Sequence, residues 1–139
     1  MTDVVLNKAE IIERALARVR VTYAAHGAML EQNIDAQDVI VLNLQRVCEA
    51  SIDLAMHVVR LKQIGLPKDS REAFTLLAKN RVVTAELAER LKNMVSFRNI
   101  AVHDYRALDW AIVRAIVEKD VLNVAEFSRL MVKEFGNVE

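Results

Sequence analysis

The chain has 139 residues, of which 53% are hydrophobic and 27% charged, and its formal net charge is zero. This length is enough for one domain, which we expect to span residues 1–139, but it is too short for two independent cores. The charge balance argues against a surface broadly coated with positive charge, as in nonspecific nucleic-acid binders, and the scarcity of glycine and proline favours long helices.

Two helices are predicted in the first half of the chain. From residues 3 to about 25, apolar residues recur every three or four positions, as on one face of a helix. A loop is expected over residues 26–33. Asp35 then has the character of an N-cap, and Asp38 follows three residues later as in a capping box. The second helix is expected to continue until the sequence Gly65-Leu66-Pro67 stops it.

The second helix is apolar on nearly all sides, which places it at the centre of a bundle or in a subunit interface. One polar stripe interrupts it, because five polar residues are spaced by three or four positions. These residues are Arg46, Glu49, Asp53, His57 and Arg60. The stripe is either a solvated face with ion pairs or the polar wall of a cleft.

Three further helices are predicted in the second half of the chain. Residues 69–80 begin with a capping-box pattern and form a short helix. Thr84 has the character of the next N-cap, and the helix that it opens leads to Arg98. The last helix is expected over residues 109–135, and no segment has the alternation of a strand. We therefore expect an all-α, up-and-down bundle of four to five helices.

The cellular location is indicated by what the sequence lacks. Cys48 is the only cysteine, so one chain can form neither an internal disulfide nor a cysteine-based zinc site. The N-terminal residues do not resemble a signal peptide, and no uncharged run is long enough to span a bilayer. We expect a cytoplasmic protein that has no metal, cofactor or membrane segment.

Arginine, histidine and tyrosine are concentrated in residues 98–105, at the junction between two predicted helices. If one helix ran unbroken through His103, Arg98 and His103 would lie about 140° apart around its axis. Their convergence requires either that the helix ends before the histidine or that Arg98 of one chain meets His103 of another. We expect a loop over residues 103–108, in which an extended backbone would place the histidine and the tyrosine on one side.

A histidine and an arginine suit phosphodiester chemistry on RNA. Histidine side chains in general can carry or release a proton near neutral pH, so His103 can take the proton of a 2'-hydroxyl or protonate the leaving 5'-oxygen. Arg98 can bind the phosphate and stabilise the charge of the transition state, with a 2',3'-cyclic phosphate as the product. Between residues 79 and 106 basic residues outnumber acidic ones, so a local basic groove is possible. The spacing alone also fits a structural arrangement in which Arg98 pairs with an acid.

The motif of an arginine, four to six residues, a histidine, any residue and a tyrosine is matched by Arg98, His103 and Tyr105. Residues 42–50 and 70–74 carry a further likeness. The chain thereby resembles the HepT-type toxins of the HEPN superfamily, which are small helical partners of minimal (MNT-type) nucleotidyltransferases in prokaryotic toxin-antitoxin pairs.

This resemblance implies a metal-independent endoribonuclease toxin that acts on RNA as a homodimer, with two motif copies facing each other across a composite cleft. Arg98 and His103 would be its catalytic residues. It also implies neutralisation by an MNT-type nucleotidyltransferase antitoxin, which in this family can adenylylate the motif tyrosine, here Tyr105. A bulky, anionic nucleotide beside the arginine and the histidine would block the phosphate site.

Three further residues are candidates for a supporting role. Asn99 either orients His103 or a phosphate, or caps the C-terminus of its helix. Glu49 and Asp53 are expected to hold Arg98 or His103 in place from the polar stripe. The alternative function is a noncatalytic helical subunit of a nucleotidyltransferase, which binds nucleotide or protein without cutting RNA.

Overall fold

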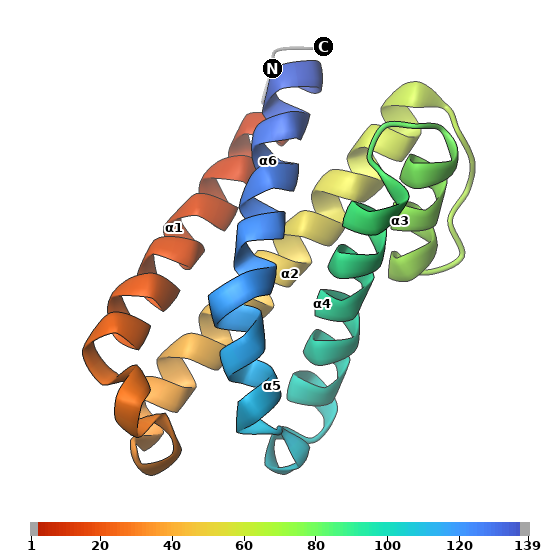
Figure 1. The fold of residues 1–139 in the computed structure, drawn as a ribbon. Coiled ribbons are helices and arrows are strands. Elements are labelled where there is room, and N and C mark those ends of the chain that lie inside the picture. The colour runs from red at the N-terminus through yellow and green to blue at the C-terminus, as the bar shows by residue number, and fades with distance from the viewer. Residues whose placement is uncertain (1–2, 137–139) are drawn as a thin grey trace.

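The computed structural model describes residues 3–136, which form a bundle of helices that run alternately up and down (Figure 1). The short helix α3 packs beside α2 and α4, outside the line of the four long helices. No strand occurs among residues 3–136, so the predicted all-α, up-and-down architecture is confirmed. The elements are α1 (Val4–His26), η1 (Gly27–Gln32), α2 (Ile34–Lys62), α3 (Ser70–Lys79), α4 (Ala85–His103), η2 (Tyr105–Ala107), α5 (Trp110–Ala115), η3 (Ile116–Asp120) and α6 (Val121–Phe135).

Helix α1 forms as its apolar pattern predicts. Its N-cap is Asp3, whose Oδ1 accepts the amide of Leu6 at 3.1 Å. The residues that recur along one face, including Ile12, Leu16 and Val19, are buried, while residues 13, 14, 17 and 18 between them are exposed. This face packs chiefly on α2, so the hydrophobic effect fixes the position of the helix.

Helix α2 begins two residues earlier than predicted. Its N-cap is Asn33, whose Oδ1 accepts the amide of Ala36 at 2.9 Å, and whose backbone is extended. Asp35 and Asp38 already lie inside the helix, so the predicted capping box at Asp35 is wrong. The expected loop before it is also wrong, because residues 27–32 form a 3-10 helix. The side-chain amide of Gln37 in α2 donates a hydrogen bond to the carbonyl of Leu30 and so ties this segment to α2.

The cap at Asn33 makes a prediction about stability. Asn33→Ala removes the acceptor for the amide of Ala36, and we expect a loss of about 1 kcal/mol in the free energy of unfolding. Asp35→Ala removes only a charge in the first turn and should cost less. Urea unfolding followed by circular dichroism, at one protein concentration, measures both. A larger loss for Asp35→Ala would show that Asp35 is the cap after all.

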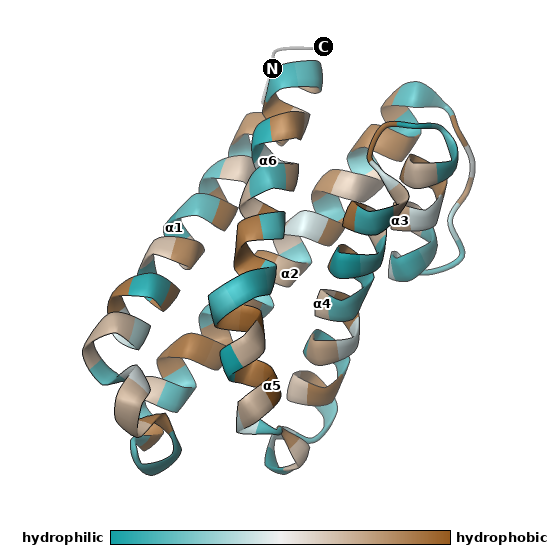
Figure 2. Cartoon of the chain, in the orientation of Figure 1, coloured by the Kyte–Doolittle hydropathy of each residue, from teal (hydrophilic) through white to brown (hydrophobic). Residues whose placement is uncertain are grey.

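The predicted central position of α2 is confirmed. It packs against α1, α3, α4 and α6, and its buried residues lie on most of its circumference. Figure 2 shows hydrophobic and hydrophilic residues alternating around the helices. The helix ends at Lys62, and the left-handed backbone of Gln63 (φ 55°) and Gly65 (φ 146°) turns the chain away. Glycine suits the second position because it has no Cβ.

Two of the predicted N-caps in the second half of the chain open α3 and α4. Asp69 Oδ1 accepts a hydrogen bond from the backbone amide of Glu72 at 2.9 Å. Thr84 Oγ1 accepts one from the backbone amide of Leu87 at 3.1 Å. Both predictions are confirmed. The Thr84 cap matters for the site, because α4 runs from it directly to residues 98–103.

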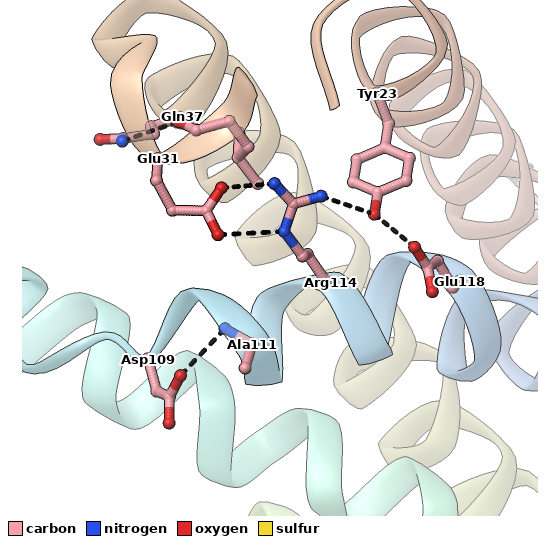
Figure 3. Close-up of polar contacts among 8 residues, drawn as sticks. Tyr23, Glu31, Gln37, Asp109, Ala111, Arg114 and Glu118 are labelled. Carbon is pink, nitrogen blue, oxygen red and sulfur yellow. Dashed lines mark hydrogen bonds and ion pairs between the residues drawn. The ribbon is translucent and has the colours of Figure 1, made fainter. Parts of the chain in front are cut away.

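The predicted last helix is made of α5, η3 and α6. Asp109 is its N-cap, as predicted, and accepts the amide of Ala111 at 2.9 Å (Figure 3). The helix contains a π-helical turn, η3, which the apolar pattern did not predict. Side chains before and after this turn, such as Val113 and Val121, are buried, so the turn keeps both halves against the core.

A polar cluster ties α5 and η3 to α1 and η1. Arg114 lies between Glu31 and Tyr23 (Figure 3). It donates to both carboxylate oxygens of Glu31 and, from Nη1, to the Tyr23 hydroxyl at 3.2 Å. The Tyr23 hydroxyl in turn donates to Glu118 at 2.5 Å. These bonds fix the start of the last helix, and therefore the hairpin between α4 and α5.

Candidate functional site

The three motif residues lie in the hairpin that joins α4 to α5, at the same end of the bundle as η1 (Figure 1). Arg98 is in α4, His103 is its last residue, and Tyr105 begins η2. The helix therefore does not end before the histidine. The expected extended loop is also wrong, because the carbonyl of Asp104 accepts the amide of Ala107 at 3.0 Å in a 3-10 turn.

Arg98 is half-buried and lies close to Cys48 of α2. Burial raises the pKa of the Cys48 thiol to about 12, while the nearby charge of Arg98 lowers it and that of Glu49 raises it. The Arg98 Nε atom is buried and has no hydrogen-bond partner. No carboxylate between residues 3 and 136 forms an ion pair with Arg98. No acid of the described chain therefore competes with an anion for the guanidinium.

His103 is exposed and is the fifth residue after Arg98 in the same unbroken helix. The two side chains therefore leave the helix axis in directions roughly 140° apart. One chain consequently does not bring them together. Asn99 is exposed within α4. The reading of Asn99 as a C-cap is wrong, because Asp104 takes that position and donates its amide to Ile100 at 2.8 Å.

Tyr105 is held at two points. Its hydroxyl donates to Asp38 Oδ1 of α2 at 3.0 Å, and its ring meets the edge of Trp110 with centroids 6.2 Å apart. Burial, followed by the hydrogen bond and charge of Asp38, raises the pKa of Tyr105 to about 12. Its side chain is 38% exposed, so a partner can still reach it. Asp38 was not among the predicted site residues, since no local sequence pattern links it to a tyrosine 67 positions away.

The polar stripe of α2 faces outward from the chain. Glu49 and Asp53 are exposed, and Asp53 pairs with Lys8 of α1 at 3.1 Å. Among residues 3–136, neither carboxylate hydrogen-bonds Arg98 or His103. The structure thus pairs Asp53 with α1 and places Glu49 beside Cys48, and the supporting role of both stays a prediction.

Two further properties concern metals and membranes. Within the described range 3–136, no group of three or more His, Cys, Asp or Glu side chains is placed to hold a metal ion. No helix in that range combines the length and apolar character needed to cross a bilayer.

Residues 12–131 match the family described as ribonuclease HepT-like. The chain belongs to the HepT-like ribonuclease family. The match extends from α1 to α6 and includes the whole motif hairpin. The resemblance to the HepT-type toxins is therefore confirmed, and this HepT-like chain is a ribonuclease.

Relatives of known structure and name support the same assignment. The mRNA nuclease HepT of Shewanella oneidensis is 43% identical over 127 residues, which cover 91% of this chain and 95% of the relative. A tri-AMPylated HEPN toxin of the same organism, solved in complex with an MNT antitoxin, superimposes with a TM-score of 0.90 at 42% identity. The match covers 96% of this HepT-like chain and all of the toxin. A toxin-antitoxin complex with AMP-PNP has the same TM-score at 41% identity, with the same coverage of both chains.

Proposed function

We propose that this chain is the toxin of a toxin-antitoxin pair, a cytoplasmic endoribonuclease whose residues 1–139 form one HEPN-like domain. The observation that carries the proposal is the arrangement of Arg98 and His103. A half-buried guanidinium and an exposed imidazole lie toward one end of the bundle. No acid in the described chain pairs with the guanidinium, which argues against a purely structural role.

The proposed reaction is an internal transesterification of RNA. The 2'-oxygen attacks the adjacent phosphorus, the bond from phosphorus to the 5'-oxygen breaks, and a 2',3'-cyclic phosphate remains. His103 takes the 2'-hydroxyl proton or supplies a proton to the 5'-oxygen, because imidazole changes charge near neutral pH. Arg98 binds the phosphate and stabilises its added negative charge. We assign supporting roles to Asn99 of α4 and to Glu49 and Asp53 of the polar stripe of α2.

The proposed active form is a homodimer. Because α4 is unbroken from Ala85 to His103, a second copy is needed to bring one chain's arginine to the other chain's histidine. Apolar side chains are exposed near the motif, namely Leu42 of α2 (47%), Ile100 (45%) and Val102 (54%) of α4. Apolar surface of this kind marks contact sites between proteins, and the two helices that carry these side chains pack against each other.

The proposed partner is an MNT-type nucleotidyltransferase antitoxin that adenylylates Tyr105. Support comes from the solved relatives, one of which is described as tri-AMPylated and bound to an MNT antitoxin. The exposure of Tyr105 lets an enzyme reach its hydroxyl. An adenylate at this position carries negative charge close to Arg98 and His103, so it would block RNA by size and by occupying their positive charge.

The proposed activity predicts cleavage of RNA without added metal. The purified protein should cut mRNA into fragments that end in a 2',3'-cyclic phosphate, and EDTA should leave the rate unchanged, because the nucleophile belongs to the substrate. Gel analysis of the fragments and of their 3'-ends measures this. Loss of activity on chelation would indicate a metal-dependent nuclease instead. No cleavage by unmodified protein would support the noncatalytic subunit.

A further inference from the structure

The contact between Tyr105 and Asp38 joins two segments that are distant in the sequence. Tyr105 begins η2, whereas Asp38 lies in the second turn of α2. The hydroxyl donates to the carboxylate at 3.0 Å. Asp38 is exposed and forms no ion pair with any residue between 3 and 136. Its charge is therefore not neutralised by a neighbouring cation, and it is available to the tyrosine.

The edge contact with Trp110 adds a second restraint on the ring. The two rings are inclined by 67° with centroids 6.2 Å apart, which is a favourable aromatic geometry. Trp110 holds the body of the ring while Asp38 holds its oxygen. The phenolic oxygen consequently has a defined position. Its O–H is directed at the Asp38 carboxylate, and this hydrogen bond leaves the lone pairs of the oxygen unused.

A tyrosine that accepts a nucleotide must lose its hydroxyl proton. The pKa of Tyr105 is raised to about 12, with burial as the largest cause, so the phenol is un-ionised near neutral pH. An acceptor within hydrogen-bond distance of the proton is what general base catalysis requires. In the described chain, Asp38 is the carboxylate that meets this condition.

We propose that Asp38 aligns the Tyr105 hydroxyl for nucleotidyl transfer and takes the proton that this hydroxyl releases. This assignment rests on the proposed function. The Tyr105 oxygen attacks the α-phosphorus of a nucleoside triphosphate supplied by the partner enzyme, and a new bond from oxygen to phosphorus forms. The bond to the β-phosphate oxygen breaks, pyrophosphate leaves with the electron pair, and the phenolic proton passes to the Asp38 carboxylate.

Once Tyr105 is adenylylated, it can no longer keep its contact with Asp38. The modified oxygen has no proton to donate to Asp38, and the new phosphodiester carries a negative charge. Two like charges at hydrogen-bond distance repel each other. Once Asp38 has lost the transferred proton to solvent, its negative charge repels the phosphodiester, and the adenylylated ring turns away from α2.

The test uses Asp38→Asn in the full-length protein, with its nucleotidyltransferase and ATP. The amide oxygen of asparagine can still accept the Tyr105 hydrogen bond but cannot take a proton at neutral pH. We expect the rate of adenylate incorporation at saturating protein to fall by roughly a hundredfold, with the KM for the toxin little changed. Intact mass against time measures the rate, and peptide mapping assigns it to Tyr105.

Two further variants make the result specific. Asp35→Asn removes an exposed carboxylate one turn earlier on α2, which has no contact with Tyr105, and should be modified at the wild-type rate. Asp38→Glu restores a carboxylate and should recover part of the lost rate. Modification of Asp38→Asn at the wild-type rate would overturn the assignment. Absence of adenylate on the wild-type protein would instead overturn the proposed regulation, and the assignment with it.

Discussion

Replacement of His103 by alanine is expected to lower the rate of RNA cleavage by roughly a hundred- to ten-thousand-fold, the contribution that a general acid or base makes in enzymes. His103 is the exposed last residue of α4, so the change leaves no buried cavity, and no side-chain hydrogen bond or ion pair of the described chain is lost. Single-turnover cleavage of a labelled RNA measures the loss. Circular dichroism and size-exclusion chromatography should show an unchanged fold and dimer.

His26→Ala is the matched control for this variant. His26 is also exposed and is also the last residue of its helix, α1. If the loss of an exposed histidine at a helix end were enough to disturb the protein, both variants would lose activity. Equal cleavage by His103→Ala and the wild-type protein would refute the catalytic role of His103.

Mixed dimers are expected to recover activity from two inactive variants. Arg98→Ala and His103→Ala should each be inactive as homodimers. In a dimer that contains one chain of each, the chain with Arg98→Ala still has His103, and its partner still has Arg98. If each site combines residues from both chains, one of the two sites is intact, and activity should return to about half the wild-type rate.

Two affinity tags allow the mixed dimer to be purified after co-expression. The control is a doubly tagged dimer in which both chains carry His103→Ala, and this should stay inactive. If Arg98 and His103 of the same chain formed the site, the mixed dimer would contain no complete pair and would also stay inactive. The experiment therefore tests the inference drawn from the unbroken helix α4.

The sequence predicted the fold well where its signals are local. Asp69, Thr84 and Asp109 each cap a helix through an amide two or three residues away, so their patterns fit within one turn. The start of α2 was missed because Asn33 and Asp35 are both good capping residues two positions apart. Only the backbone conformation decides between them, and this depends on how η1 packs.

In the candidate site too, the sequence predicted the residues that lie close together in the chain and missed the contacts between distant segments. Arg98, His103 and Tyr105 are close in the sequence, so the motif could be found from it alone. Asp38 and the Arg114 cluster are linked to their partners by contacts across more than sixty residues. Such contacts join η2 to α2 and α5 to η1 at one end of the bundle, and no spacing rule encodes them.

The π-helical turn at Ile116–Asp120 has a consequence for how the family has diverged. A π-turn accommodates one more residue than an α-turn, and each residue rotates the rest of a helix by about 100°. A relative without this turn must therefore lack one residue here to keep Val121 and Phe127 in its core. An alignment of such relatives should place its single-residue gap within these five positions. The turn would then record an old insertion of one residue in the last helix.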